Sequence, residues 1–478
     1  MENMVDMENT NLFLLDGHDD DKFHDECGVV GIYSKDPNVH VGTLSYLALY
    51  ALQHRGQESA GIASFDGDHI HLEKGMGLVS DIFDEPKVRS LEGYCSVGHV
   101  RYSTAGGSSI QNAQPIYSKF KQGEIAVAHN GQLINVDVLR EMFEDLGYSF
   151  ETTSDSEIII KMIARAAKKG IERAIDDTVQ TIKGSYALTM VVDGMLVGVR
   201  DPQGIRPLAI GKLGENGYVL ASETCAFDCL GATYFRDVEP GEIIIIDDNG
   251  LRSIQHNERT YARPCSFEYV YFARPDSTID GVNVHESRKK AGAILWEESA
   301  VEADVVVGVP DSGLDAALGL SLASGIPYDI GLVKNKYVGR SFIMPDQQAR
   351  ERAVHIKLSA MKSVVAGKRV ILVDDSIVRG TTSRQLVNLM KEAGAKEVHM
   401  RIPSPVVAFP CYFGIDTPYR EQLIGSRMSV EEMRSHLGAD SLAFLSQEGL
   451  IDSIEPGGRF CLGCFTGEYP MSVHMEDE

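Results

Sequence analysis

The sequence predicts a two-part α/β and α+β protein, with mostly antiparallel sheets first and a parallel α/β part second. Between Cys27 and Ile254, short apolar strands recur at regular intervals between turn residues, as in sheets covered by helices. Beyond Arg259, aliphatic runs such as Arg369–Val373 lead through small-residue loops into helical patterns, which is typical of buried parallel strands. From Ser404 onwards, helical patterns predominate and indicate a helical C-terminal extension.

The composition indicates a globular protein with an acidic surface. The chain has 478 residues, of which 43% are hydrophobic, and a net charge of −24, so it can form two or three domains with a large core. The negative charge disfavours nucleic-acid and anionic-membrane partners. No apolar run approaches the ~20 residues of a membrane span. Residues 1–26 are acidic and lack the basic start of a secretory signal, so we expect a cytoplasmic enzyme.

Cys27 opens the first expected strand, directly after this acidic leader. A lone cysteine in such a place is most often a small core residue. The alternative is a nucleophile that becomes the first residue when the leader is removed. Its own α-amino group, with a pKa near 7.7–8.0, would then act as the base beside the thiol.

Four later segments favour the nucleophile. Arg55–Gly56 forms a turn before a strand, and Arg101 ends a strand, where its guanidinium can hold a carboxylate. Asn130–Gly131 can form an oxyanion hole from a side-chain amide and a backbone N–H. Asp155 places an acid at a helix start. Each has a structural alternative, because Asn-Gly is common in turns and Asp155 can be a simple N-cap.

Together these segments resemble the glutaminase domain of the N-terminal-nucleophile, or class II, glutamine amidotransferases. The resemblance covers about residues 27–254 and implies an αββα sandwich. It also implies that Cys27 attacks the glutamine amide while Asn130 and Gly131 stabilise the oxyanion. Arg101 would hold the glutamine α-carboxylate and Asp155 its α-amino group, with Arg55 and Gly56 lining the pocket.

The resemblance further implies that residues 1–26 are a propeptide, removed before Cys27, and that the glutaminase domain spans residues 27–258. Three other cysteines have no such context, so we expect them to be core thiols: Cys95, Cys225 and Cys229. Past the boundary, the aromatic stretch Phe267–Phe272 reads as a strand.

The second part is organised around Asp374–Asp375, which directly follow the strand Arg369–Val373. Ligands of open α/β sheets lie beyond the carboxyl ends of the strands. The loop Ser376–Thr382 offers backbone N–H groups at a helix N-terminus, which suit a phosphate, and the acids suit sugar hydroxyls or a hard cation. The pattern therefore predicts a phosphorylated sugar as ligand. The alternative is an ordinary strand-loop-helix unit with two solvated acids.

Two more segments can bind anions. The strand that begins at Ala303 runs into a second small-residue loop, Pro310–Gly313, which can hold a pyrophosphate. The stretch 334–352 is locally basic in an acidic chain and can close over a substrate. The alternative for this stretch is a solvated surface strip.

These three segments resemble the type I phosphoribosyltransferases over about residues 259–403. The resemblance implies phosphoribosyl pyrophosphate (PRPP) as substrate and one Mg²⁺ per subunit, held by Ser312, Asp374 and Asp375. The residues expected to bind PRPP are Asp311, Ser312, Gly313, Lys334, Lys336, Arg340, Asp374, Asp375, Ser376, Arg379, Gly380, Thr381 and Thr382.

Four remaining cysteines have the character of metal ligands. Cys461 and Cys464 form a C-x₂-C pair, while Cys265 and Cys411 each stand beside a proline outside the expected strands. Four thiolates suit zinc or an iron–sulfur cluster, and the spacing does not separate the two. A disulfide is disfavoured in the cytoplasm.

The order of the two parts resembles the glutamine phosphoribosylpyrophosphate amidotransferases, specifically their propeptide-bearing type with a [4Fe–4S] cluster. The resemblance implies synthesis of 5-phosphoribosylamine, glutamate and pyrophosphate from glutamine, PRPP and water, the first committed step of purine synthesis. It assigns Cys265, Cys411, Cys461 and Cys464 to one cluster per subunit, completed by residues 404–478. It also implies a homotetramer inhibited by the purine nucleotides AMP, GMP and ADP.

Two other functions compete with this interpretation. A glutamine-dependent transferase with another acceptor, such as a hexosamine synthase, has no use for Asp374–Asp375 and the Gly380–Thr382 loop. A PRPP-sensing regulator without enzyme activity does not need Cys27 and its glutamine-site residues, and the net charge of −24 opposes DNA binding.

Overall fold

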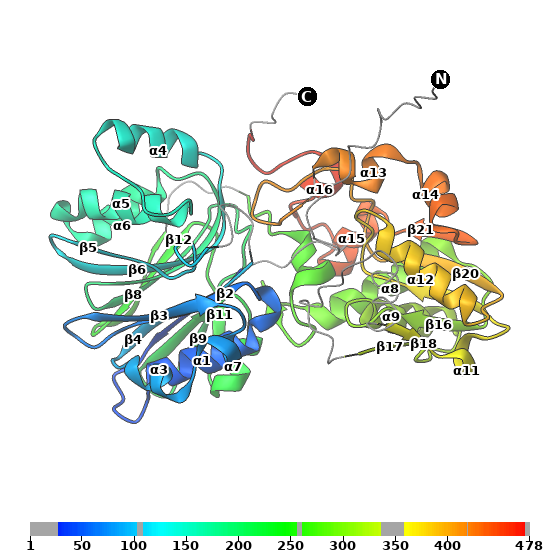
Figure 1. Cartoon of the computed structure of the whole chain (residues 1–478), viewed down its shortest axis with the longest axis horizontal. Helices are drawn as coiled ribbons and strands as arrows, with labels where there is room; N and C mark the ends of the chain where they lie inside the picture. The colour runs from blue at the N-terminus through cyan, green and yellow to red at the C-terminus, as the bar shows by residue number, and fades with distance from the viewer. Residues whose placement is uncertain (1–26, 103–108, 256–260, 336–357, 418, 474–478) are drawn as a thin grey trace, which may run out of the picture.

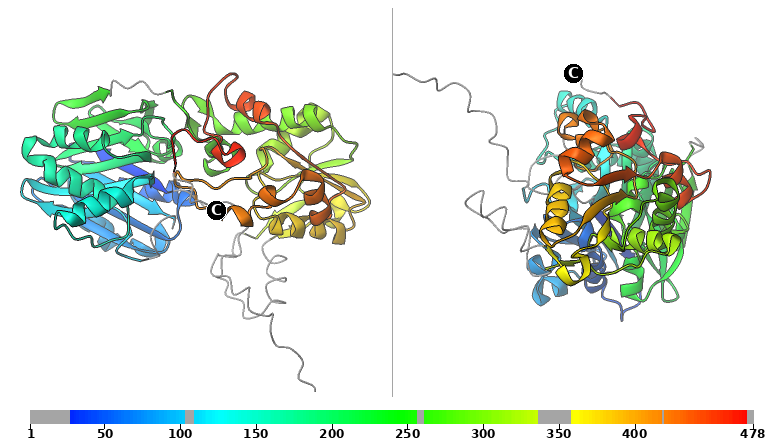
Figure 2. Two further views of the ribbon diagram at one scale, coloured as in Figure 1. Left: turned by 90° about the horizontal axis from the view of Figure 1, so that it is seen from above. Right: turned by 90° about the vertical axis from the view of Figure 1, so that its right-hand side faces the viewer.

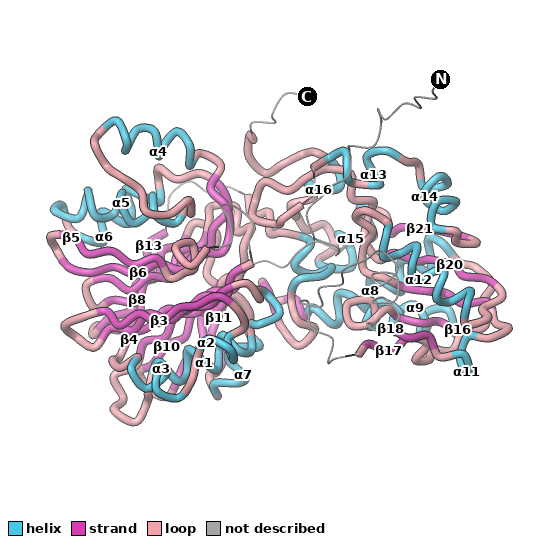
Figure 3. The backbone as a smooth tube through the Cα atoms, viewed as in Figure 1, coloured by secondary structure: helices cyan, strands magenta, loops and turns pink. Residues whose placement is uncertain are grey.

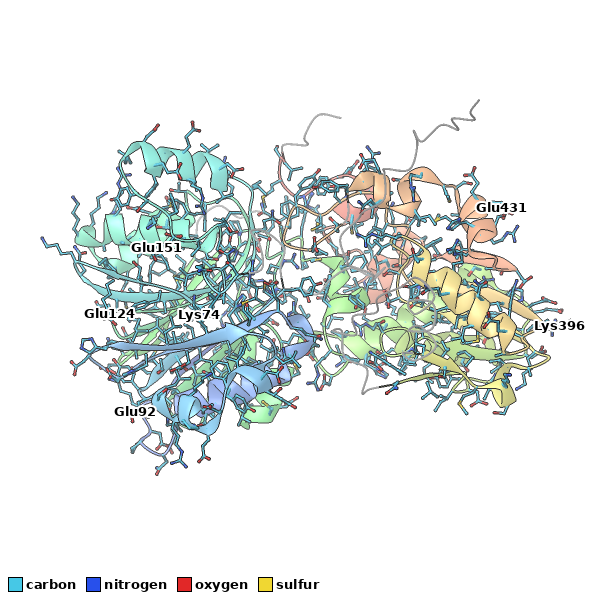
Figure 4. All side chains as sticks on the ribbon, in the orientation of Figure 1. Lys74, Glu92, Glu124, Glu151, Lys396 and Glu431 are labelled. Carbon is cyan, nitrogen blue, oxygen red and sulfur yellow. The ribbon has the colours of Figure 1, made fainter. Side chains whose placement is uncertain are left out.

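The computed structural model describes residues 27–102, 109–255, 261–335, 358–417 and 419–473, and they form two parts side by side along the long axis (Figure 1). Glu124 and Lys396 lie towards opposite ends of this axis (Figure 4). The leader 1–26 and most of the basic stretch 334–352 lie outside the described residues. Within the described ranges, no helix is long and apolar enough to cross a membrane.

The first part contains two stacked antiparallel sheets, seen as two magenta layers in Figure 3. In spatial order, the seven-stranded sheet consists of β11 (Thr233–Asp237), β9 (Ala209–Leu213), β10 (Gly217–Ala221), β1 (Gly28–Tyr33), β4 (Cys95–Arg101), β2 (Ser59–Phe65) and β3 (Ile70–Met76). The six-stranded sheet consists of β13 (Gly250–Gln255), β12 (Glu242–Asp247), β8 (Met195–Arg200), β7 (Gly184–Val192), β6 (Gly123–Leu133) and β5 (Ile116–Phe120).

Helices cover the outer face of each sheet. Beside the seven-stranded sheet lie α1 (Val41–Ala51), the 3₁₀ turn η1 (Gln53–Arg55), α2 (Val79–Ile82), α3 (Glu85–Ser90) and α7 (Cys225–Leu230). Beside the six-stranded sheet lie α4 (Val136–Asp145), α5 (Ser156–Ala166), η2 (Ala167–Lys169) and α6 (Ile171–Val179). The sequence of β1 is apolar throughout because both faces of this strand are buried. Val30 and Ile32 pack towards the helices, while Val29 and Tyr33 pack between the sheets. The expected αββα sandwich is confirmed.

The second part is built on a parallel sheet with the strand order β16 (Val305–Gly308), β19 (Arg369–Val373), β20 (Glu397–Ile402) and β21 (Ser441–Phe444). Val370 and Leu372 pack with α12 (Thr381–Glu392) and α14 (Val430–Leu437), whereas Ile371 and Val373 face α9 (Leu314–Ser324) on the other side. Both faces of β19 are therefore buried, which accounts for its unbroken aliphatic run.

The other elements surround this sheet, as the two views in Figure 2 show. The helices are α8 (Val284–Ser299), α9 (Leu314–Ser324), α11 (Lys362–Val365), α12 (Thr381–Glu392), η4 (Arg420–Gln422), α13 (Ile424–Arg427), α14 (Val430–Leu437), α15 (Gln447–Ile454) and α16 (Gly463–Thr466). Two small antiparallel strand pairs complete the second part. One consists of β14 (Thr278–Ile279) and β15 (Val282–Asn283), and the other of β17 (Leu332–Lys334) and β18 (Leu358–Ala360).

Three expectations differ from the structure. The aromatic stretch expected as a strand forms the π-helix η3 (Glu268–Phe272), because its rings pack in several directions into the core between the two parts. The C-terminal region expected to be helical also supplies β21, which pairs with β20. Cys95 and Cys225 are buried as expected, but Cys229 is exposed at the last turn of α7, so its assignment to the core was wrong.

Candidate active sites

Cys27 lies immediately before β1, the central strand of the seven-stranded sheet. Because Gly28 pairs with Val100 across the β1–β4 ladder, Cys27 is placed beside Arg101. The thiol is buried, and its Sγ lies 3.7 Å from the carbonyl oxygen of Tyr102. Burial raises the pKa of Cys27, and the Arg101 guanidinium opposes this only in part. The thiol therefore needs a nearby base to act as a nucleophile at neutral pH.

Arg101 ends β4, as its proposed role in holding a carboxylate requires. The guanidinium is almost completely buried, and its Nη1 lies 2.8 Å from Oε1 of Glu58. Glu58 precedes β2, which pairs with β4 with Ser59 opposite Arg101. The acid partner therefore comes from the neighbouring strand, and the sequence analysis missed it.

Asn130 and Gly131 lie near the end of β6, in the other sheet. The Nδ2 group of Asn130 is buried and has no hydrogen-bond partner among the described residues, so it can donate to an acceptor that enters the site. Gly131 has a φ of 139°, and a Cβ there would lie 2.2 Å from the Ser185 carbonyl oxygen. Only glycine fits this position, so a backbone N–H beside the Asn130 amide is preserved.

Asp155 directly precedes α5, but its carboxylate does not cap that helix. Instead, Oδ2 accepts a hydrogen bond of 3.0 Å from the Leu133 N–H, and Oδ1 lies 3.3 Å from Nδ1 of His129. Burial raises the pKa of Asp155, but the charge of His129 and these hydrogen bonds outweigh it and hold the pKa below its usual value. Asp155 is therefore an ionised acid, suited to binding an ammonium group. His129 was missed, although it stands next to Asn130.

Arg55 lies behind Cys27 and not in an open pocket. Its Nε donates to the Cys27 carbonyl oxygen at 3.1 Å, and its Nη groups form buried ion pairs with Glu223 and Glu268. Gly56 packs against β4, where a Cβ would lie 2.7 Å from the backbone of Arg101. Arg55 and Gly56 therefore support the backbone of Cys27 and Arg101. The glutamine-binding role expected of Arg55 and Gly56 stays a prediction.

In the second part, the parallel register brings the two expected ligand loops together. Gly308 pairs with Val373, so the loops after β16 and β19 meet at one edge of the sheet. There the Ser312 hydroxyl donates a hydrogen bond to the Asp375 carboxylate, and Ser376 Oγ donates to Oδ1 of Asp375 at 2.7 Å.

Asp374 and Asp375 are both buried at this edge. The Ser404 hydroxyl donates to the backbone carbonyl of Asp375 at 2.9 Å and fixes the turn. Two carboxylates and a hydroxyl at one sheet edge form an oxygen-rich set that suits a hard cation such as Mg²⁺ together with ligand oxygens. Among the described residues, no three His, Cys, Asp or Glu side chains are arranged to hold one ion by themselves.

The loop between Asp375 and α12 is shaped by Gly380, which has a φ of 85° and precedes Thr381 and Thr382 at the start of the helix. A Cβ on Gly380 would lie 2.7 Å from Ile424 Cδ1. Arg379 points to the C-terminal region, where its Nη2 donates to Gln422 Oε1 at 3.2 Å. Packing therefore holds this loop in place beside the N-terminus of α12, a position that suits an anion.

The loop Pro310–Gly313 is also closely packed, because a Cβ on Gly313 would lie 2.5 Å from the Val373 carbonyl oxygen. At its rim, Lys334 Nζ lies 2.8 Å from Asp311 Oδ2, and both side chains are largely exposed. Lys336 and Arg340, also expected to bind PRPP, lie outside the described residues.

Arg288 of α8 was also missed, because nothing in its sequence context indicates a site. It donates to the carbonyl oxygens of Tyr269 at 2.7 Å and Ala273 at 2.8 Å. Burial lowers the pKa of Arg288, and the charges of Asp315 and Asp375 oppose this. This buried cation therefore joins η3 electrostatically to the acids at the sheet edge.

The four remaining cysteines converge in the core between the two parts. Cys265 forms a parallel β-bridge with Cys461, and Ala408 N–H donates to the Cys464 carbonyl oxygen at 3.0 Å. None of the four forms a disulfide, and Phe413 N–H donates to Cys411 Sγ at 3.3 Å. Burial raises the pKa of Cys265 to about 12.

Burial also raises the pKa values of Cys461 and Cys464. Repulsion between the negative thiolate forms of neighbouring cysteines raises them further. Such a set becomes thiolate when a cation binds among the sulfurs, because the added positive charge offsets both effects. Thiolate donors suit a metal centre. In the described part of the chain, however, the four side chains are not arranged as a metal site, so a cluster at these cysteines stays a prediction.

Comparisons with known proteins agree with this arrangement. The glutamine amidotransferase domain family matches residues 99–229, and the phosphoribosyl transferase domain family matches residues 283–402. The amidophosphoribosyltransferase of Bacillus subtilis is 48% identical, over 95% of this chain and 96% of the relative. That of Archaeoglobus fulgidus is 50% identical, over 94% of this chain and 99% of the relative.

Two solved structures share the whole architecture. One is described as the allosteric regulatory enzyme of purine biosynthesis and matches with a TM-score of 0.90 and 48% identity, over 94% of this chain and 97% of the other. The second is glutamine PRPP amidotransferase from B. subtilis in complex with ADP and GMP, with a TM-score of 0.89 and 47% identity, over 95% of this chain and 99% of the other. With identity near one half over almost the full length of both chains, this protein belongs to the amidophosphoribosyltransferase family.

Proposed function

We propose that this chain catalyses glutamine-dependent synthesis of 5-phosphoribosylamine from PRPP. In the first half-reaction, water and glutamine give glutamate and ammonia. In the second, ammonia displaces pyrophosphate from the anomeric carbon of PRPP. The family assignment supports this reaction, and the two sites described above provide one set of residues for each half.

For the first half-reaction, Cys27 is the nucleophile and attacks the glutamine amide carbon. The raised pKa of its buried thiol makes a base necessary, and the α-amino group freed by cleavage supplies it. Asn130 Nδ2, which is unpaired among the described residues, and the Gly131 N–H donate hydrogen bonds to the oxyanion. Arg101 binds the α-carboxylate and Asp155 the α-ammonium, which agrees with the opposite charges of the two side chains.

For the second half-reaction, Asp374 and Asp375 hold the ribose hydroxyls, and Ser376–Thr382 hold the 5′-phosphate. Ser312 and its loop hold the pyrophosphate, and Lys334, Lys336 and Arg340 contribute positive charge to PRPP binding. Ser312, Asp374 and Asp375 would hold Mg²⁺, which would supply positive charge to offset that of the leaving pyrophosphate. The protein contributes mainly positioning, because displacement at the anomeric carbon needs little covalent assistance.

We infer three functional divisions of the chain: the glutaminase domain 27–258, the phosphoribosyltransferase domain 259–403 and the region 404–478. Residues 1–26 act as a propeptide, cut between Glu26 and Cys27. This inference rests on the chemistry of Cys27, whose amino group must be free to serve as the base.

We assign Cys265, Cys411, Cys461 and Cys464 to one [4Fe–4S] cluster per subunit with a structural role. The four cysteines lie in one core region, where Cys265 and Cys464 are buried and Cys411 and Cys461 are partly buried, and this proximity supports the assignment. We also propose a cytoplasmic homotetramer inhibited by AMP, GMP and ADP. The solved B. subtilis relative, which holds ADP and GMP, supports the nucleotide part of this proposal.

The observation that carries the proposal is that one chain holds two separate groups of candidate site residues, around Cys27 and around Asp375. The test measures pyrophosphate and glutamate release from PRPP, Mg²⁺ and glutamine, on protein purified without oxygen. We expect the two products in a one-to-one ratio. Cys27→Ser should abolish turnover with glutamine and leave turnover with ammonia. Equal loss of both activities would refute separate sites.

A further inference from the structure

The segment Cys411–Ile415 comes from the far end of the chain, yet it contacts the oxyanion hole of the glutaminase. A Cβ built on Gly414 would lie 3.0 Å from the Cα and carbonyl carbon of Gly131. Gly414 itself has a φ of 98°, a conformation that favours glycine. The backbones of Gly131 and Gly414 therefore pack directly against each other, with no space for a side chain between them.

The carbonyl oxygen of Phe413 anchors this contact. It accepts a hydrogen bond of 2.7 Å from the Ser185 hydroxyl and one of 3.0 Å from Nε of Arg206, and Nη2 of Arg206 also donates to it. Ser185, Arg206 and Phe413 are all buried. Three donors on one buried carbonyl fix its position more firmly than a typical backbone contact.

Ser185 also connects the anchor to the oxyanion strand. Its hydroxyl oxygen accepts a hydrogen bond of 3.3 Å from the N–H of Gln132, the residue after Gly131. On the other side, the Ser185 carbonyl oxygen would lie 2.2 Å from a Cβ on Gly131. Gly131 is thus held between β7 and the C-terminal segment, and a shift of either displaces its N–H.

We infer that Ser185, Arg206 and Gly414 are positioning residues for the oxyanion hole, so that the C-terminal segment forms part of the glutaminase site. None of the three reacts with glutamine. They act by fixing the Gly131 N–H where negative charge develops, and an oxyanion donor works only at short distance and correct angle. The inference rests on the proposed function, because it presupposes that Asn130 and Gly131 hold the oxyanion.

The test is Gly414→Ala in the full chain with its leader cleaved and its metal centre intact. The added methyl group pushes against Gly131. Loss of one oxyanion donor costs ~10²–10³ in kcat, so we expect displacement to lower the glutamine kcat at least ~10-fold. The glutamine KM should change by less than about twofold, because bound glutamine before reaction carries no oxyanion. Ammonia-dependent synthesis should be unchanged.

Gly438→Ala is the matched control. Gly438 has a φ of 74° at the end of α14, and a Cβ there meets nothing within 4 Å. This variant carries similar backbone strain without any contact to Gly131, so its glutamine kcat should stay near that of the unmodified protein. A Gly414→Ala kcat equal to that of Gly438→Ala would overturn the inference.

Ser185→Ala provides a second test that does not add volume. It removes one donor to Phe413 and the acceptor of Gln132, and we expect the same selective fall in glutamine kcat. Its control is Ser453→Ala, since the buried Ser453 hydroxyl donates to a carbonyl, that of Leu450, at 2.7 Å in α15. Parallel loss of glutamine and ammonia activities in Ser185→Ala would indicate general damage and refute a positioning role. An unmodified chain without glutaminase activity would instead refute the proposed function.

Discussion

Arg55 and Glu268 form a buried ion pair that joins the two parts of the molecule, with Arg55 Nη2 2.6 Å from Glu268 Oε1. Arg55 belongs to η1 beneath Cys27, and Glu268 begins the π-helix η3 of the second part. Arg55 also holds the Cys27 carbonyl oxygen. The pair therefore connects the position of the nucleophile to the packing between the two parts.

We predict that Glu268→Gln destabilises the protein strongly. Removing one partner of a buried ion pair typically costs about 3–5 kcal/mol. Arg55 keeps its pair with Glu223, but Arg206, whose Nη1 lies 3.7 Å from Glu268 Oε1, also loses a carboxylate partner. Unfolding in urea measures the change. Glu85→Gln is the control, since its ion pair with Arg89 is exposed and such pairs contribute little. Equal urea midpoints for the two variants would contradict the prediction.

The buried His99 predicts a pH dependence of stability. Its Nε2 lies 3.0 Å from the His129 carbonyl oxygen, which only accepts, so the proton is on Nε2. In the described part of the chain no group bonds to the buried Nδ1, and burial lowers the pKa of His99 to about 3. The unfolded chain, with a histidine pKa near 6.5, binds a proton that the folded chain excludes. The free energy of unfolding is therefore highest above pH 6.5 and decreases as the pH falls from 6.5 towards 3.

By pH 5 the loss from His99 amounts to roughly 2 kcal/mol. His99→Gln keeps the donor to His129 but does not titrate, so its unfolding midpoint should fall less between pH 7.5 and pH 5. His69→Gln changes an exposed histidine and should follow the unmodified protein. If all three proteins respond to acid alike, His99 is not the responsible group.

At the second site, we predict that Asp375→Asn lowers synthesis at least ~10²-fold with glutamine and with ammonia, because both nitrogen sources use the same PRPP site. Steady-state pyrophosphate release with each nitrogen source measures the effect. Asp304→Asn is the control, because Asp304 bonds Arg369 at the opposite end of β19. Loss confined to glutamine would argue against the assigned role.

Cys461→Ser should remove most of the bound iron and lower the yield of folded protein, because a cluster with three thiolates is bound weakly and leaves buried polar groups behind. Iron content and visible absorbance measure the loss. Cys95→Ser alters a buried thiol in the core between the sheets and should retain the iron. A soluble, fully active, iron-free Cys461→Ser protein would refute the cluster assignment.

Much of this protein is determined locally by its sequence. Short, regularly spaced apolar strands led to a sandwich of mostly antiparallel sheets, and the run before Asp374–Asp375 led to a buried parallel strand, because burial leaves a direct signal in the sequence. The αββα arrangement itself came from the family resemblance. Gly313 and Gly380 lie in loops, as expected, where a Cβ would come within 2.5 Å and 2.7 Å of a neighbouring atom, respectively.

Only the tertiary structure decided what depends on distant partners. The stretch at Phe267–Phe272 has strand-forming residues but forms η3, because packing between the two parts overrides local propensity. The partners of Arg55 and Arg101 come from other segments, and no spacing rule connects them. The contact of Gly414 with Gly131 likewise arises from the fold alone. Sequence patterns record which residues are buried, whereas the identity of their neighbours is fixed by long-range packing.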